Sequence, residues 1–254
     1  MDPKKVIPCL DVKAGRLVKG VHFLELREVG DPAEAASAYS QAGADELVFL
    51  DITATVEGRK TMVDAVARTV EAIDVPLTVG GGIASTDDMQ RLFDAGASKV
   101  SINTAAVRDP ELIARSAERF GSERITVAID TAQSARQPSG FEVMVRGGRE
   151  GAGTDAVEWA RQAERLGAGC ILPTSMDADG TQVGYDIPMT RAIADAVSVP
   201  VIASGGAGAL EHLSAAILEG HADAVLVASI AHFGTFSIRQ MKEHLASRGI
   251  AVNL

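Results

Sequence analysis

The chain has 254 residues, of which 46% are hydrophobic and only 4% are aromatic. This length and composition suit one large α/β core, with parallel strands buried on both faces by Ala, Val, Ile and Leu. The formal net charge of −10 argues against nucleic acid or an anionic membrane as the main partner. Two cysteines cannot build a disulfide framework, and no apolar run reaches the roughly 18 residues of a membrane span. We therefore expect a soluble, cytoplasmic protein.

Short β-branched runs alternate with Ala-rich amphipathic stretches along the chain. The pattern predicts eight strands, at residues 6–11, 46–51, 76–80, 99–103, 125–130, 169–174, 200–204 and 224–228. It predicts helices near residues 32–43, 59–73, 86–95, 109–120, 154–167, 187–197, 209–219 and 236–248. Asp31 and Asp109 each precede a proline and, like Ser85, are expected to cap a helix. Eight strand–helix units fit either a closed (βα)₈ barrel or an open doubly wound sheet.

The two halves of the chain repeat each other. The run VPLTVGGG at 75–82 recurs 124 residues later as VPVIASGG, and ASKVSINT at 97–104 recurs 125 residues later as ADAVLVAS. This period is too long for a solenoid, whose repeats run roughly 20–50 residues. Matched halves favour closure, and no Gly-x-Gly-x-x-Gly turn follows the first strand to support a dinucleotide-binding sheet. We predict a single α/β domain, a (βα)₈ TIM barrel with half-barrels of about 1–122 and 123–254.

Asp11 and Asp130 end matched strands in the two halves, at 6–11 and 125–130. The carboxyl ends of barrel strands carry the active site, and two carboxylates facing one cavity are typical of general acid–base chemistry. Each could instead cap the loop that follows it. Their symmetry-related positions favour a shared catalytic role. Asp51, at the end of strand 46–51, ranks below them because it could equally be a structural hydrogen-bond partner.

Two matched sets of strand ends have the character of phosphate sites. Glycines at 80–82 and at 205, 206 and 208 let the backbone approach a ligand, while 101–104 and 227–229 lead into short helical starts that favour an anion. The glycines could simply make tight turns, but a matched set in each half favours a substrate with a phosphate at each end. Lys19 could contact this anionic substrate or remain a solvated loop lysine.

The five histidines are scattered, with no pair at i, i+4, so no metal site and no cofactor are expected. His232 is interpreted as a packed or capping residue, and nothing in the chain has the pattern of a nucleophile elbow.

These motifs resemble a family of histidine biosynthesis, the cyclase subunits of imidazole glycerol phosphate synthases. The matching stretches span nearly the whole chain: IPCLDV (7–12), GRLVKG (15–20), GDP (30–32), DELVFLDITA (45–54), TVGGGI (78–83), VSINTAA (100–106), TSMDADGT (174–181) and IASGGAG (202–208). The resemblance implies a barrel that docks a glutamine amidotransferase and receives ammonia from it. It implies cyclisation of a phosphoribulosyl-formimino aminoimidazole carboxamide nucleotide to imidazole glycerol phosphate and aminoimidazole carboxamide ribonucleotide.

The same resemblance implies roles for individual residues. Asp11 and Asp130 match the general acid–base pair of the family. The matched substrate and phosphate contacts are Lys19, Gly82, Asn103, Thr104, Asp179, Gly205, Gly206, Ala228 and Ser229. Which aspartate is the acid and which the base at each step stays open.

The family carries a charged ring at the opposite end of its barrel, interpreted as a gate for ammonia. Lys5, Glu46 and Lys99 match three of its charges, but Cys170 stands where the family usually has Glu. Two cations then face one anion, which puts a gate closed by ion pairs in question.

The chain departs from the family pattern at further points. Pro173 replaces Leu inside a central strand, so we expect a local distortion there. Ser98 replaces Asp on the expected docking face, and the loop expected at 151–154 differs in sequence.

Two alternatives to the cyclase stay open. One is the sister isomerase of the same pathway, which also has two aspartates; the CLDV motif at 9–12 and the DADGT stretch at 177–181 favour the cyclase. The other is a weakly active phosphate-binding barrel that serves as a scaffold or partner.

Overall fold

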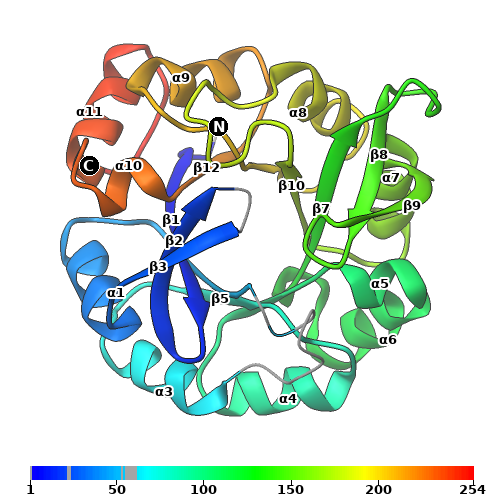
Figure 1. The fold of residues 1–254 in the computed structure, drawn as a ribbon, viewed down its shortest axis with the longest axis horizontal. Coiled ribbons are helices and arrows are strands. Elements are labelled where there is room, and N and C mark those ends of the chain that lie inside the picture. The colour runs from blue at the N-terminus through cyan, green and yellow to red at the C-terminus, as the bar shows by residue number, and fades with distance from the viewer. Residues whose placement is uncertain (1, 22–23, 53, 55–61) are drawn as a thin grey trace.

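Parallel strands form the wall of a barrel, and helices surround it (Figure 1). The structure is a computed structural model that describes residues 2–21, 24–52, 54 and 62–254. The described barrel strands are β1 (Lys5–Lys13), β4 (Leu47–Asp51), β5 (Leu77–Gly80), β6 (Lys99–Ile102), β7 (Ile125–Gln133), β10 (Cys170–Ser175), β11 (Ile202–Ala203) and β12 (Ala224–Val227). The covering helices are α1 (Pro32–Gln41), α3 (Val63–Glu71), α4 (Thr86–Asp94), α6 (Glu111–Phe120), α7 (Ala156–Arg165), α8 (Ile187–Ala194), α9 (Leu210–Leu218) and α11 (Ile238–Ser247). The predicted (βα)₈ barrel is confirmed, although residues 59–61 of one predicted helix lie outside the described residues.

Closure of the barrel is weakest beside Pro173. Strand β10 pairs without interruption to β7, with Pro173 opposite Ile129. Toward β11 only isolated bridges form, at Ile171 with Val201 and at Thr174 with Ser204. The Pro173 carbonyl accepts the Ser204 N–H on this side. The N–H and C=O of one strand residue point to the same neighbour, so the N–H that proline lacks would also have faced β11. The expected distortion is thus confined to one edge of the strand.

Two antiparallel hairpins extend the barrel at its carboxyl end, and the sequence reading missed both. Strands β2 (Arg16–Val21) and β3 (Leu24–Gly30) follow β1, while β8 (Phe141–Val145) and β9 (Glu150–Asp155) follow β7. Pairing with these hairpins carries β1 and β7 beyond the predicted ends at Asp11 and Asp130. The segment 151–154, expected as a loop, lies in β9.

Two of the three predicted helix N-caps are confirmed. Asp31 and Ser85 accept hydrogen bonds from backbone N–H groups at the starts of α1 and α4. The prediction for Asp109 is wrong because α6 begins at Glu111 after Pro110, and Asp109 instead closes the short helix α5 (Thr104–Arg108). Its carboxylate accepts from Arg115 at 2.6 Å.

Side chains of β1 alternate between the helical shell and the barrel interior. Leu10 and Val12 belong to the cluster packed beneath the helices, whereas Ile7 and Cys9 cluster with Leu172 and Val48 of other strands. The period-two rule places Lys5 and Asp11 on the same inward face as Ile7 and Cys9. In the described part of the chain, no helix is long and apolar enough to cross a membrane.

Candidate active site

Asp130 lies on the inward face of β7, between residues that come from other strands. Its pKa is raised to about 7, first because burial penalises the charged form and second because Asp179 carries a like charge. A hydrogen bond from Asn103 opposes this shift. A carboxyl group with a pKa near neutrality can both accept and return a proton at physiological pH.

Asp11 lies on the inward face of β1, on the opposite side of the barrel wall. Strands β4, β5 and β6 separate β1 from β7 in one direction, and β10, β11 and β12 separate them in the other. The Cys9 thiol donates to the Asp11 carboxylate, with Sγ 3.2 Å from Oδ1. The two aspartates predicted as a pair therefore lie on inward faces of opposite strands of the wall, each a few residues before a hairpin.

One hollow at the carboxyl end of β10, β11 and β12 collects five of the residues predicted to bind substrate. It encloses about 340 Å³, including its open mouth. The lining includes Asp179, Gly205, Gly206, Ala228 and Ser229. Asp179 thus belongs both to this hollow and to the electrostatic surroundings of Asp130.

The matched set in the first half gathers Asn103 and Thr104 at the start of α5. Thr104 is buried, and its hydroxyl oxygen accepts the Arg146 backbone N–H at 2.9 Å. The side-chain oxygen of Asn103 is buried without a hydrogen-bond partner among the described residues. Arg146 lies in the turn between β8 and β9, so sequence reasoning that missed the hairpin also missed this contact.

The backbone of the two sets matches closely. Gly81 and Gly205, 124 residues apart, have φ of 93° and 88°. A Cβ on Gly81 would lie 2.1 Å from the Asp51 carbonyl oxygen, and one on Gly205 would lie 2.8 Å from that of Ser175. Both glycines therefore have a structural reason for their identity, and Gly205 also lines the hollow. Gly82 and Gly206 also have positive φ, 70° and 104°.

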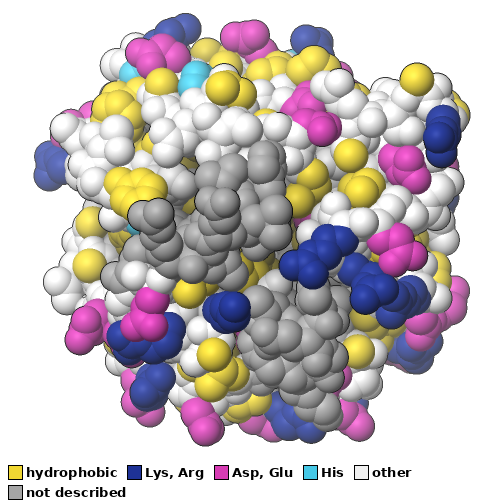
Figure 2. Space-filling model, viewed as in Figure 1, with side chains coloured by type: hydrophobic (Ala, Val, Ile, Leu, Met, Phe, Trp, Pro, Cys, Tyr) yellow, Lys and Arg dark blue, Asp and Glu magenta, His cyan; other side chains and the backbone are white. Residues whose placement is uncertain are grey.

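The start points of the two short helices match as well. Asn103 has φ −131° and ψ −92°, and Ala228, at the start of α10 (Ser229–His232), has φ −127° and ψ −84°. The face of the molecule seen in Figure 2 carries several Lys and Arg side chains near its centre, in spite of the negative net charge. Lys19 lies in β2, and its side chain is outside the described part of the structure.

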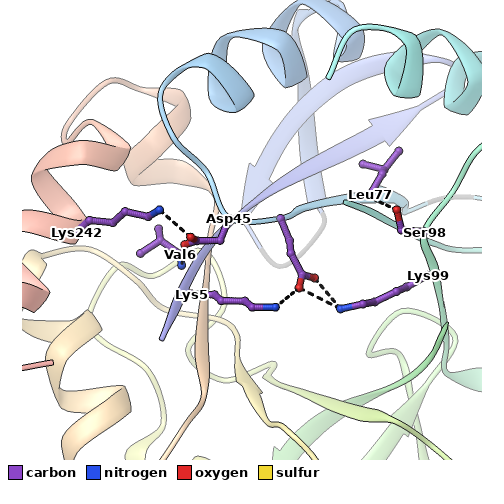
Figure 3. Close-up of polar contacts among 8 residues, drawn as sticks. Lys5, Val6, Asp45, Leu77, Ser98, Lys99 and Lys242 are labelled. Carbon is purple, nitrogen blue, oxygen red and sulfur yellow. Dashed lines mark hydrogen bonds and ion pairs between the residues drawn. The ribbon is translucent and has the colours of Figure 1, made fainter. Parts of the chain in front are cut away.

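At the amino end of the barrel, Glu46 holds both lysines of the predicted ring (Figure 3). Lys5 donates to Oε1 of Glu46, and Lys99 Nζ lies 3.0 Å from Oε1 and 2.9 Å from Oε2. Burial opposes ionisation of Glu46, but the hydrogen bonds and charges of the lysines outweigh it and hold its pKa below the ordinary value. Burial raises the pKa of the nearby Cys170 thiol to about 12, so Cys170 adds no charge to the ring.

Ser98 keeps a backbone contact that a carboxylate makes in the second half. Its hydroxyl accepts the Leu77 N–H at 3.3 Å (Figure 3), whereas Asp223, 125 residues later, accepts the Val201 N–H at 3.0 Å. Serine therefore preserves the link between neighbouring strands and removes only the charge.

Comparison with known proteins agrees with the motifs. The model of a family described as "Histidine biosynthesis protein" matches residues 5–237. A protein of Trichormus variabilis named imidazole glycerol phosphate synthase subunit HisF is 57% identical over 253 residues, covering 99% of this chain and 98% of its own. A protein of the same name from a Nostoc species is also 57% identical, over 99% of this chain and 97% of its own.

Proposed function

The chain belongs to the histidine biosynthesis protein family, and from this premise we propose how its barrel performs the cyclase reaction of imidazole glycerol phosphate synthase. The protein is the cyclase subunit of that enzyme, since relatives of this name match it over almost their full length. Similarity of this extent to HisF proteins favours the cyclase over the sister isomerase and over the weakly active scaffold. Ammonia and a phosphoribulosyl-formimino aminoimidazole carboxamide nucleotide give imidazole glycerol phosphate and aminoimidazole carboxamide ribonucleotide.

The two phosphates of the substrate occupy the two matched sets of strand ends. Gly82, Asn103 and Thr104 hold one phosphate, and Gly205, Gly206, Ala228 and Ser229 hold the other. Asp179 and Lys19 contact the part of the substrate between them. Each half-barrel, about 1–122 and 123–254, then supplies one phosphate site and one catalytic carboxylate.

Asp11 and Asp130 act on the middle of the substrate. As ammonia adds to the ketone, one carboxylate takes a proton from the nitrogen and the other gives a proton to the oxygen that leaves as water. The same pair then moves protons as the imidazole ring closes and the C–N bond to the leaving ribonucleotide breaks. A pKa of about 7 suits Asp130 to take up and release a proton in this sequence.

The observation that supports this assignment is that Asp130 interacts with residues beside both proposed phosphate sites. Asn103 of the first set donates a hydrogen bond to Asp130, and Asp179, whose charge adds to the effect of burial in raising the pKa of Asp130, lines the hollow with the second set. A substrate held at both ends therefore has its reacting centre beside this carboxylate.

Ammonia enters through the opposite end of the barrel from a glutaminase partner docked there, in the cytoplasm. Lys5, Glu46 and Lys99 form the gate at this entrance, with Glu46 paired to both lysines. Among the described residues, no group of three or more His, Cys, Asp or Glu side chains is placed to hold a metal ion.

Turnover with ammonium salts tests the assigned roles. Asp11→Asn and Asp130→Asn should each lower kcat by roughly 10²- to 10⁴-fold, because each removes one proton-transfer group. Substrate affinity should change little, because both phosphate sets remain. A kcat near the wild-type value in either variant would show that its carboxylate is not catalytic.

A further inference from the structure

The hydrogen-bond ladder between β1 and β12 is interrupted beside the active site. Residues Lys5 to Pro8 pair with Ala224 to Val227, and the Lys5 N–H donates to the Asp223 carbonyl, so odd-numbered residues of β1 bond toward β12. If β12 continued, Cys9 would lie opposite Ala228, and the Cys9 carbonyl would accept the amide of the next residue, Ser229. Instead β12 ends at Val227 and the chain turns into α10.

The imidazole ring of His232 takes the place of that amide. Its Nε2 lies 2.7 Å from the Cys9 carbonyl oxygen, and its Nδ1 lies 2.6 Å from the Tyr39 hydroxyl oxygen. A carbonyl oxygen only accepts, so Nε2 carries a proton, and in the neutral tautomer with this proton Nδ1 accepts from the Tyr39 hydroxyl. Burial raises the pKa of Tyr39, which keeps the donating proton on its hydroxyl. With His232 bonded to the Cys9 carbonyl, the ladder does not require a hydrogen bond from the Ser229 amide. Ser229 lines the hollow instead.

Cys9 connects this contact to Asp11, which lies two residues further along the same face of β1. The backbone of Cys9 is held by His232, while its thiol donates to the Asp11 carboxylate at 3.2 Å. A chain of contacts thus runs from Tyr39 in α1 through His232 in α10 to the strand that carries Asp11.

In the other half of the barrel, the catalytic aspartate is held by a direct side-chain contact. Asn103 stands where the second half has Ala228, and it reaches Asp130 directly by a hydrogen bond. The methyl group of Ala228 cannot make such a bond. The first-half residue that matches His232 is Val107, which has no ring nitrogen to offer.

We propose that His232 is a positioning residue: its ring completes the β1–β12 ladder and so fixes Asp11 relative to the turn at Ala228 and Ser229. The inference rests on the proposed function, in which this turn binds one phosphate and Asp11 transfers protons. His232 itself touches no reacting atom in this scheme. Its loss should leave the phosphate bound and misplace the carboxylate.

Two substitutions of similar size separate this role from simple packing. Glutamine can donate through its amide nitrogen to Cys9 and accept from Tyr39 through its oxygen, whereas leucine can do neither. His232→Leu should lower kcat for ammonia-dependent turnover by about 10- to 100-fold, with a smaller rise in KM, because a displaced catalytic group costs rate. His232→Gln should recover most of the lost kcat. His244→Leu is the control, since His244 bonds Ser214 at 3.3 Å within the helical shell, and it should leave kcat unchanged.

An unchanged kcat in a folded His232→Leu protein, or equal losses in the leucine and glutamine variants, would overturn the proposal. Nitrogen-15 NMR of histidine-labelled protein tests the ring without any turnover. We expect a neutral His232 with its proton on Nε2, and an Nδ1 signal that shifts in Tyr39→Phe; a neutral ring protonated on Nδ1 would refute the inference. Activity of Asp11→Asn is measured in parallel, so an error in the role of Asp11 is distinguished from an error in the role of His232.

Discussion

The charge of Asp179 raises the pKa of Asp130, although the two residues lie on different strand–helix units of the barrel. Asp179→Asn should therefore move the limb of the kcat/KM profile that reports Asp130 from near pH 7 toward lower pH. Asp177→Asn is the matched control, because it removes the same charge two residues away, where the carboxylate accepts from the Gln133 backbone. An equal movement of the limb in both variants would contradict a specific coupling of Asp179 with Asp130.

The raised pKa of Asp130 also makes a prediction for stability. The unfolded chain releases this proton near pH 3.8, whereas the folded protein keeps it until about pH 7. Folding stability therefore falls as pH rises through this window, and the full penalty persists above it. Asp130→Asn should be more stable than wild type at pH 8, by up to roughly 4 kcal/mol, and the difference should vanish near pH 4.

Urea unfolding at several pH values measures this difference. Glu118→Gln is the control. It removes one negative charge from the exposed face of α6 and leaves the buried site of Asp130 unchanged. A stability difference for Asp130→Asn that does not change between pH 4 and pH 8 would show that burial of the charge is not its cause.

Three glycines separate backbone strain from steric overlap. Gly43 has φ +87° with open space where a Cβ would lie, so Gly43→Ala should cost only about 1–2 kcal/mol of left-handed strain. Gly205→Ala adds a close approach to the Ser175 carbonyl, and Gly81→Ala adds a closer one to that of Asp51. The loss of unfolding free energy should rise in the order Gly43, Gly205, Gly81, as measured by urea denaturation. Equal losses at the three positions would mean that the surrounding backbone yields freely.

A buried ion pair holds α11 to the amino end of the barrel. The side chains of Lys242 and Asp45 are only 5% and 7% exposed, and Lys242 Nζ lies 2.8 Å from Asp45 Oδ1 (Figure 3). Asp45 also accepts the Val6 N–H of β1 at 2.9 Å. Lys242→Met should cost about 3–5 kcal/mol, because it leaves the buried carboxylate without its cation.

Arg239→Met on the same helix provides the comparison. Its partner Glu243 forms an exposed i,i+4 pair, so the cost should stay within about 0.5 kcal/mol. Thermal unfolding of both variants measures the two costs. Similar losses of stability in Lys242→Met and Arg239→Met would contradict a special contribution of the buried pair.

The proposed gate should affect the transfer of ammonia from the glutaminase partner rather than the cyclase reaction itself. Glu46→Gln removes the anion shared by Lys5 and Lys99, so the two cations should repel and the entrance should lose its order. With the glutaminase partner present, the ratio of glutamine-driven to ammonia-driven turnover should fall several-fold. Lys4→Met breaks an ion pair with Asp223 outside the ring and should preserve the ratio. A ratio that stays unchanged in Glu46→Gln would exclude the gate role of Glu46.

The barrel strands could be predicted because each one is a short apolar run between turn residues, as with Leu47–Asp51 and Ala224–Val227. The hairpins were missed because their strands mix charged, polar and glycine residues with apolar ones, although the glycine pair 147–148 in the turn after β8 is a hairpin signal. The repeat predicted matched strand ends in the two halves, and the φ angles of Gly81 and Gly205 agree with that match. The pKa of Asp130 could not, because it depends on Asn103 and Asp179, which only the folded barrel brings together.

The inward row of β1 links the two ends of the enzyme. Lys5 at the proposed gate and Asp11 at the proposed reacting centre are six residues apart on one strand, or about 20 Å at the usual rise. Ile7 and Cys9 lie between them, so the stretch along this strand presents uncharged side chains to a neutral molecule such as ammonia. Because successive side chains face opposite sides, deleting one residue between Cys9 and Lys5 would turn one of the two ends out of the barrel. Intake and reaction are thus kept in register by a single strand.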